Sequence, residues 1–381
     1  MVLCSHGVED LVASEAEEQG AEEVSLGPQG VVELQGDLAV AYRLCLWSRC
    51  ASRVLMPLAE VPAESSDAFY PGVRSISWLD HLGPDDTLAV EARLRKARAT
   101  NSHYVALKTK DAIVDRVRAE TGRRPEVDLE DPRLRIHVFV EGDRATVSLD
   151  LSGEALHRRG YRGETGPAPL KETVAAAVLL RADWPAMANR GGAFLDPMCG
   201  SGTVVLEALM IAADMAPGLG RTRFGFEGWR GHDPDLWARI QDEARERRAA
   251  GLGGGLSPFV GSDRAADPLS AAEASARRLG VEEHLDLRER ALSEASPPDQ
   301  APEGLVATNP PYGIRAGSEE EAEQTYRELG EVLRTRFGGW KAAVLAAEGS
   351  QLGSMELRAY KTNRLYNGPI QCLLGVYEIF A

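Results

Sequence analysis

Two short segments of this chain hold the residue types from which chemistry is expected. The first, residues 195–203 (LDPMCGSGT), places an acidic residue before a glycine-rich turn. The second, residues 308–313 (TNPPYG), combines an amide, two prolines and an aromatic side chain. Each follows a short apolar run that we predict to be a strand, and ligands of parallel sheets bind where such strands end. The two segments therefore predict one shared site.

The glycine-rich turn indicates a ligand that the backbone approaches closely. Gly200 and Gly202 have no Cβ atom to keep a ligand away, and the amides that begin the following helix face it. The spacing lacks the GxGxxG pattern of a dinucleotide site. An amino-acid tail fits better, with Asp196 near its ammonium group and the turn amides near its carboxylate. This combination favours S-adenosylmethionine (SAM) as the cofactor.

A second acidic residue completes the predicted cofactor site. Asp263 follows a predicted strand at residues 259–260, and a carboxylate at that edge can accept both hydroxyls of a ribose. The alternative for Asp196 and Asp263 is a structural role in capping or turn formation. We expect cofactor contacts from the following residues: Asp196, Pro197, Cys199, Gly200, Ser201, Gly202, Thr203, Asp263 and Asn309.

The Asn-Pro-Pro-aromatic segment is suited to holding an exocyclic amine of a nucleic-acid base. Such an amine is a weak nucleophile because its lone pair delocalises into the ring. The Asn309 side-chain oxygen and the Pro310 carbonyl can accept its two N–H groups and turn the lone pair toward a methyl donor. Tyr312 offers a face on which an unstacked base can rest. The catalytic candidates are Asn309, Pro310, Pro311 and Tyr312, and the alternative is a proline-rich turn without chemistry.

The pattern from residue 170 onward predicts the fold that positions these residues. Expected helices and strands alternate there, with helices at residues 170–180, 203–213, 268–279 and 325–337 and strands at 193–195, 259–260, 305–308 and 342–346. This alternation is typical of an α/β fold with a parallel sheet covered on both faces. An alternating stretch with an Asn-Gly turn, residues 365–380, predicts an antiparallel hairpin at the sheet edge. Residues 217–255 form a Gly- and Arg-rich insertion.

The front part of the chain has a different pattern, which predicts smaller α+β units. Helices are expected at residues 7–20, 37–50 and 103–122, and strands at 31–34, 86–94, 134–140 and 145–149. Residues 156–169 are rich in glycine, proline and arginine and have no periodicity, which predicts a linker between the two parts.

Charge is unevenly distributed along this acidic chain. The net charge of -15 argues against a protein that coats nucleic acid through bulk attraction. Residues 91–124, however, hold ten Lys and Arg against four Asp and Glu, a local excess of six positive charges. On charge alone, this stretch is either a phosphate-binding face or a solvated helix surface.

The cysteines and the apolar runs narrow the class of protein further. The five cysteines are scattered and no pair has CxxC spacing, which indicates neither a metal site nor a disulfide framework. No apolar run is long enough to span a bilayer, and the N-terminus lacks a signal pattern. We therefore expect a cytoplasmic protein that binds no metal.

Taken with their flanks, the two segments resemble a known family. The chain is similar to the THUMP-domain RNA methyltransferases that modify the 2-amino group of guanine, in particular the bacterial enzymes acting on large-subunit (23S) ribosomal RNA. The resemblance covers nearly the whole chain. Besides the two segments it rests on these stretches: residues 7–21, 124–153, 156–162 (LHRRGYR), 168–179 (APLKETVAAAVL), 224–229 (FGFEGW) and 365–372 (LYNGPIQC).

The resemblance implies a fold and a partner. It implies a ferredoxin-like unit at residues 1–55, a THUMP RNA-binding domain at 56–155, a linker at 156–169 and a Rossmann-like class I SAM-dependent methyltransferase domain at 170–381. It also gives the basic stretch a purpose in holding structured RNA. We expect a monomer or a weak dimer. RNA contacts are expected from Arg93, Arg95, Lys96, Arg98, Lys108, Arg158, Arg159 and Arg162.

The chain departs from the family pattern at two places. Family members usually carry an Asp after the third strand that contacts the adenine of the cofactor, and this chain has Ala291 there. This sequence has one catalytic domain, whereas some relatives carry a second methyltransferase domain behind the first. We therefore do not expect a second methylation activity here. The alternative readings are methylation of guanine in tRNA, methylation of adenine in DNA, and a non-catalytic RNA-binding or ribosome-assembly protein.

Overall fold

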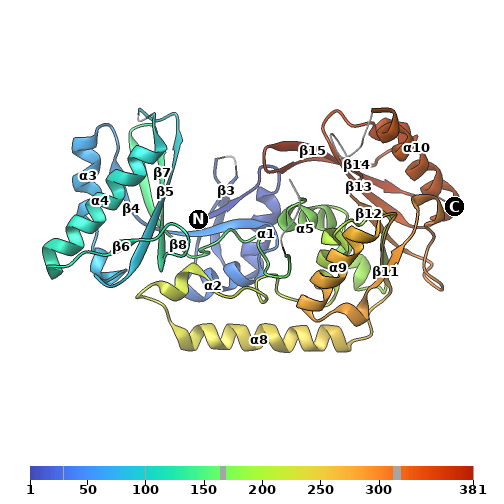
Figure 1. Cartoon of the computed structure of the whole chain (residues 1–381), viewed down its shortest axis with the longest axis horizontal. Helices are drawn as coiled ribbons and strands as arrows, with labels where there is room; N and C mark the ends of the chain where they lie inside the picture. Colours follow the sequence, from blue (N-terminus) through green and yellow to red (C-terminus); the bar gives the residue numbers. More distant parts are fainter. Residues whose placement is uncertain (29, 99, 164–168, 312–318, 381) are drawn as a thin grey trace.

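The structure is a computed structural model that describes residues 1–28, 30–98, 100–163, 169–311 and 319–380. Two sheets dominate the described residues, one of eight strands and one of seven. Figure 1 shows an elongated molecule: the outer half of the first sheet lies at one end, the N-terminal unit in the middle, and the second sheet at the other end.

The eight-stranded sheet runs continuously through the whole front part of the chain. Its order is β2-β3-β1-β4-β8-β7-β5-β6. The strands are β1 (Val2–Cys4), β2 (Glu22–Leu26), β3 (Val31–Gln35), β4 (Ala51–Pro62), β5 (Thr87–Arg95), β6 (Glu126–Val127), β7 (Leu134–Glu141) and β8 (Arg144–Asp150). Strand β4 belongs to both halves, because Arg53 pairs with β1 whereas Leu55 pairs with β8. The predicted boundary between residues 55 and 56 therefore lies inside one strand.

The front part of the chain also contributes helices that pack against this sheet. They are α1 (Glu9–Glu18), α2 (Leu38–Trp47), α3 (Ser66–Ser75) and α4 (Ser102–Thr121). Helices α3 and α4 pack together on the outer side of the sheet, where Ile113 of α4 and Leu88 of β5 share one core. Side chains of a strand alternate between faces, so Arg93 and Arg95 of β5 lie on the face opposite to Leu88.

The seven-stranded sheet has the predicted doubly wound α/β architecture. Its order is β11-β10-β9-β12-β13-β15-β14, and the five strands from β11 to β13 are parallel. The strands are β9 (Ala193–Asp196), β10 (Phe259–Asp263), β11 (Asp286–Glu289), β12 (Gly304–Thr308), β13 (Lys341–Ala347), β14 (Lys361–Asn367) and β15 (Ile370–Glu378). The hairpin of β14 and β15 is antiparallel, as predicted, and closes the edge on β13.

The helices around this sheet follow from apolar sequence. They are α5 (Glu172–Arg181), α6 (Trp184–Ala188), α7 (Thr203–Ala212), α9 (Ala266–Leu279) and α10 (Glu319–Arg336). Helix α7 is apolar all round apart from Thr203 and Glu207, and residues 203–210 are all buried. A helix of this kind belongs inside a domain, and here it joins the central strand β9 to the interface with the front part.

The insertion at residues 217–255 contains a long helix that the glycine- and arginine-rich composition did not lead us to expect. Helix α8 (Pro234–Gly253) begins with Asp233 as its cap, whose side chain accepts from the Leu236 amide at 2.9 Å. It packs against α2, where Arg247 lies 3.8 Å from the centre of the Trp47 ring. Figure 1 shows α8 running along one side of the molecule beneath both the N-terminal unit and the α/β part.

The FGFEGW segment of the same insertion locks into the front domains. Phe226 stacks on Tyr42 of α2 with 4.1 Å between ring centres, and its amide donates to the Leu151 carbonyl at 3.0 Å. Gly225 lies so close to β8 that a Cβ atom there would be 2.4 Å from the Asp150 carbonyl oxygen. The insertion therefore fixes the position of the front part against the α/β part.

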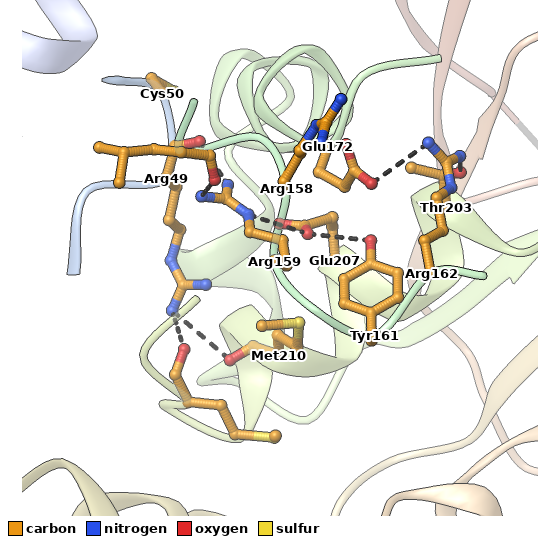
Figure 2. Close-up of polar contacts among 12 residues, drawn as sticks. Arg49, Cys50, Arg158, Arg159, Tyr161, Arg162, Glu172, Thr203, Glu207 and Met210 are labelled. Atoms are coloured by element: carbon orange, nitrogen blue, oxygen red, sulfur yellow. Dashed lines mark hydrogen bonds and ion pairs between the residues drawn. The ribbon is translucent and has the colours of Figure 1, made fainter. Parts of the chain in front are cut away.

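A buried charged network makes the second connection between the two parts (Figure 2). The side chains of Arg159 in the linker and Glu207 in α7 form an ion pair with 3.5 Å between Nε and Oε1, and each is at most 1% exposed. The Tyr161 hydroxyl donates to the same Glu207 oxygen at 3.1 Å. Arg159 also donates to the Arg49 carbonyl at 2.6 Å, and Arg49 in turn donates to the Met215 carbonyl at 2.9 Å. One guanidinium thus connects all three regions.

Removing this guanidinium should destabilise the protein strongly. We expect Arg159→Ala to lower the free energy of unfolding by about 3–5 kcal/mol, because Glu207 would remain buried without a counter-charge. The matched control is Arg158→Ala, since the Arg158 side chain is 66% exposed and pairs with the exposed Glu154, and it should cost at most about 1 kcal/mol. Urea unfolding followed by fluorescence measures both values. Equal losses in the two variants would contradict a dominant role for the buried pair.

Candidate active site

The register of three parallel strands brings the predicted site residues together. Strand β9 lies between β10 and β12, with Leu195 paired to both Val260 and Val306. Asp196 is the last residue of β9, Asp263 is the last residue of β10, and Asn309 directly follows β12. Residues separated by more than a hundred positions therefore meet at one carboxyl edge, as the sequence predicted.

The glycine-rich turn connects β9 to α7 and is held by its neighbour β10. The Gly200 amide donates to Asp263 Oδ2 at 3.0 Å, and the Cys199 amide donates to the Ser262 carbonyl at 2.8 Å. Gly200 and Gly202 have φ angles of +53° and +80°, in the left-handed region that favours glycine. In this conformation one carboxylate oxygen of Asp263 holds the turn, and Oδ1 accepts from the Ala265 amide at 3.0 Å.

The two glycines are required for different reasons. A Cβ atom on Gly202 would lie 2.9 Å from the Ala272 Cβ, so packing against α9 excludes a side chain there. A Cβ atom on Gly200 would meet nothing within 4 Å among the described residues. Gly200 therefore borders open space at the carboxyl edge of the sheet, which is where the sequence predicts a ligand.

Asp196 is buried in a way that suits a cationic partner. Its side chain accepts from the Met198 amide at 3.2 Å, and the residue is 1% exposed. Burial raises the pKa of this carboxyl to about 7, while the Thr308 hydroxyl and the Met198 amide act in the opposite direction. A positive group placed beside Asp196 would favour its ionised form, so the site fits a ligand that carries an ammonium group.

Asn309 presents an unused hydrogen-bond acceptor at the same edge. Its Oδ1 atom is buried and accepts no hydrogen bond from the residues that the structure describes. Pro310, which follows it, is buried, and Pro311 is partly exposed. A buried acceptor without a donor is costly, which indicates that a ligand donor belongs there. Tyr312, the fourth catalytic candidate, lies outside the described residues.

Ala291 stands where the family resemblance led us to expect an acidic residue. It follows β11, is exposed, and its amide donates to Glu294 Oε2 at 3.2 Å. The preceding amide, that of Arg290, donates to the Asp263 carbonyl at 2.9 Å. The backbone at this position is thus held next to the site although its side chain carries no acid.

The basic residues predicted to contact RNA do not form one surface. Arg93 and Arg95 lie on the face of the front sheet opposite to Leu88, where they pair with Glu91 and Glu141. Lys108 lies on α4, on the other side of that sheet, with its ammonium 5.8 Å from the centre of the Tyr104 ring. Lys96 and Arg98 are exposed in the loop after β5. RNA bound to the face of the sheet that carries Arg93 would therefore lie on the side opposite to Lys108.

The three linker arginines differ in their accessibility. Arg158 is exposed, as an RNA contact requires. Arg159 is 2% exposed, so our prediction that it contacts RNA is wrong: its charge is used inside the protein by Glu207. Arg162 is mostly buried, bonds to the Thr203 hydroxyl at the start of α7 and lies 3.2 Å from Glu172. It is placed to hold the helix that follows the glycine-rich turn (Figure 2).

The pairing of a linker arginine with Glu207 was not predicted from the sequence, although the sequence contained a signal for it. Glu207 is an acidic residue inside an otherwise apolar helical stretch, TVVLEALMIA. A buried carboxylate needs a cationic partner, and the arginine-rich segment LHRRGYR is a source of one. Pairing the two would have indicated that part of this linker packs into the protein.

Metal-binding clusters and membrane-spanning helices are both absent from the described residues. No cluster of His, Cys, Asp and Glu in the described ranges has the arrangement needed to hold a metal ion. Likewise, none of the helices described is both long and apolar enough to cross a membrane.

The chain matches three protein families along its length. Residues 1–55 match the RlmL ferredoxin-like domain, residues 63–150 match the THUMP domain, and residues 159–375 match the RMKL-like methyltransferase domain. Together the three matches account for most of the chain.

Curated relatives are similar over nearly the full chain. The chain is 48% identical over 98% of its length to a protein named ribosomal RNA large subunit methyltransferase K/L from Syntrophotalea carbinolica, of which it covers 52%. It is 44% identical over 98% of its length to the protein of that name from Methylococcus capsulatus, of which it covers 50%. The chain thus spans about half the length of the curated relatives it matches.

Solved structures share the whole architecture. SMU.472, determined in complex with S-adenosylhomocysteine (SAH), is 28% identical with a TM-score of 0.86, and the match covers 100% of this chain and 97% of that one. A protein from Listeria monocytogenes, named a predicted N6-adenine-specific DNA methylase, is 29% identical with a TM-score of 0.86 and coverage of 99% and 95%. TrmN from Thermus thermophilus shares the fold with a TM-score of 0.69 at 19% identity.

The two turn glycines should respond differently to substitution by alanine. We expect Gly200→Ala to cost about 1 kcal/mol of stability from left-handed backbone strain alone. Gly202→Ala adds the collision with Ala272, so its loss should reach about 2–4 kcal/mol. Thermal unfolding of the ligand-free protein measures both, with Gly200→Ala as the matched control. A Gly202→Ala variant as stable as Gly200→Ala would show that the turn relaxes around the new side chain.

Proposed function

The chain belongs to the family of RMKL-like methyltransferase domains, and on that premise we propose that it transfers a methyl group from SAM to the exocyclic 2-amino group of a guanine in RNA. The RNA we propose is 23S ribosomal RNA. The observation that carries the proposal is the buried Asn309 oxygen, which has no hydrogen-bond partner among the described residues. Asn309 directly follows β12, the strand next to the one that ends in the buried Asp196 carboxylate.

The domain organisation supports RNA as the substrate. The methyltransferase domain is preceded by a THUMP domain and an RlmL ferredoxin-like domain, and the named relatives are ribosomal RNA methyltransferases. The FGFEGW and LYNG segments resemble those of guanine-modifying members, which favours guanine over adenine. The name of the Listeria protein points to adenine in DNA, so DNA enters the test below as a competing substrate.

The cofactor site fits SAM on the residues present. SAM supplies an electrophilic methyl group on a sulfonium centre. Asp196 would accept a hydrogen bond from an ammonium group. The positive charge would oppose the effect of burial, which raises the pKa of Asp196 to about 7. The open space beside Gly200 leaves room for the ligand backbone to approach. Asp263 would receive ribose hydroxyls with its remaining acceptor capacity, and SAH bound to SMU.472 supports this class of cofactor.

The Asn309 segment would orient the nucleophile. Its unpartnered Oδ1 and the Pro310 carbonyl each accept one N–H of the guanine amine, which places the nitrogen lone pair outside the plane of the base. The prolines restrict the backbone, so the two acceptors keep their spacing. Catalysis then rests on positioning, and the extra proton leaves the amine after transfer without a strict need for a general base.

Removing the Asn309 acceptor should affect turnover far more than cofactor binding. We expect Asn309→Ala to lower kcat by roughly 100-fold to 1000-fold, the cost of one preorganised polar group (about 3–4 kcal/mol), while the Kd for SAM changes little. The conservative variant Asn309→Asp retains an acceptor oxygen and should keep more activity than Asn309→Ala. Single-turnover methyl transfer and calorimetry of SAM binding give the two readouts. Unchanged turnover in Asn309→Ala would exclude the proposed role.

The substrate is tested with labelled SAM and nucleic acid from a strain that lacks this protein. Purified 23S rRNA, 16S rRNA, tRNA and DNA are incubated separately, and the modified nucleoside is identified by mass spectrometry. We expect N2-methylguanosine in 23S rRNA alone. Methylguanosine in tRNA would redirect the proposal to tRNA, and methyladenine in DNA would overturn it. The absence of label in every pool, including intact ribosomal precursors, would favour a non-catalytic RNA-binding protein.

A further inference from the structure

A large cavity lies where the THUMP domain, the linker and the methyltransferase domain meet. Its volume is about 1210 Å³. The wall comes from five stretches that are distant in sequence: residues 130–135, 153–163, 169–172, 220–225 and 367–370. Ligand pockets for small molecules are typically about 300–1,000 Å³, so this cavity has room for more than one nucleotide-sized group.

The charge of the cavity wall is opposite to that of the protein. Eight basic residues line it: Arg133, Arg135, Arg158, Arg159, Arg162, Lys171, Arg221 and Arg223. Four acidic residues line it: Glu130, Asp131, Glu154 and Glu172. Among the lining residues, basic groups outnumber acidic ones by four in a chain whose net charge is -15. Two of these basic groups, Arg133 and Arg159, are paired with Asp86 and Glu207, which do not line the cavity. A concave surface of one sign focuses the field and attracts an anion.

Most of the acidic groups in the wall are already neutralised by arginines. Asp131 pairs with Arg223 at 2.6 Å, Glu154 with Arg158 at 3.0 Å, and Glu172 with Arg162 at 3.2 Å. The cationic groups outside these pairs therefore determine what the cavity attracts.

Two cations in the wall have side chains without a partner of any kind among the described residues, whereas Arg221 donates to backbone carbonyls. The side chains of Arg135 and Lys171 form neither a hydrogen bond nor an ion pair within the part of the chain that the structure describes, and both are partly exposed. Arg135 lies on β7 in the THUMP domain, whereas Lys171 caps α5 at the start of the methyltransferase domain. Positive charges on both domains therefore face the same space.

We propose that this cavity binds the sugar-phosphate backbone of the RNA segment adjoining the target nucleotide, with Arg135 and Lys171 contacting phosphates from the two domains. The inference rests on the proposed function and assigns a backbone-binding site to it. A polyanionic strand suits the cavity better than a single phosphate, because the unpaired cations lie on different domains.

The part of the cavity wall formed by Arg159 and Arg162 would hold the bound strand in a fixed position relative to the methylation site. Arg162 lines the cavity and bonds to Thr203, the first residue after the glycine-rich turn. Arg159 lines it too and pairs with Glu207 in the same helix. A backbone held in the cavity would therefore lie against elements that are rigidly attached to the helix of the cofactor turn.

The test uses the full chain and a fluorescein-labelled single-stranded RNA oligonucleotide of 12 nucleotides. Arg135→Gln, Lys171→Gln and the double variant are compared with the matched control Arg239→Gln, which removes an exposed charge from α8. The Kd is measured between 50 and 300 mM salt. Each lost phosphate contact should weaken binding about fivefold at 0.1 M salt and reduce the log–log salt slope by about 0.7.

The outcomes separate this inference from the proposed function. We expect both single variants to lose affinity and slope, the double variant to lose more, and Arg239→Gln to behave like wild type. If the two cavity variants bind the oligonucleotide with wild-type affinity and slope, or if the wild-type protein does not bind it, the inference is overturned. If the cavity variants lose affinity as expected but the wild type methylates no RNA, the cavity assignment stands and the proposed function fails.

Discussion

The fixed relation between the front part of the chain and the α/β part depends on a buried charge, the Arg159 guanidinium. Arg159 is surrounded by the Arg49 carbonyl, the Leu156 carbonyl and the Glu207 carboxylate, which come from three regions of the chain. A buried guanidinium tolerates little movement of its partners, because each lost contact leaves an unpaired polar group in a dry interior. The linker is therefore an ordered part of the interface around this residue.

Two regions of opposite electrostatic character result from this arrangement. At the carboxyl edge of the sheet, the buried Asp196 carboxylate and the Asn309 side-chain oxygen can accept hydrogen bonds from cationic and N–H groups. The wall of the cavity, by contrast, holds more basic than acidic residues. An acidic protein can hold an RNA substrate when its few uncompensated cations are gathered in one concave place, since the remaining negative surface then disfavours other binding modes.

The sequence predicted the α/β part well because its signals are local. Short apolar strands, amphipathic or apolar helices and the Asn-Gly turn of the last hairpin each depend on neighbouring residues. Helix α8 was missed because just three of its twenty residues, Trp237, Ile240 and Ala244, are buried, so its apolar periodicity is weak. Strand β4 was missed as well, because it serves two half-sheets and its burial does not alternate regularly.

The sequence alone determined which chemical groups the site contains. The types and order of five residues specify the groups at the sheet edge: Asp196, Gly200, Gly202, Asp263 and Asn309. A residue that follows or ends a parallel strand necessarily lies at the carboxyl edge of the sheet. The partners of long charged side chains were decided by tertiary structure. Arg158 and Arg159 are adjacent in sequence, yet one is exposed and the other is buried against Glu207, 48 residues away. Charge gives a residue the capacity to bind RNA, but burial and pairing are set by the packing of distant elements, which no local pattern encodes.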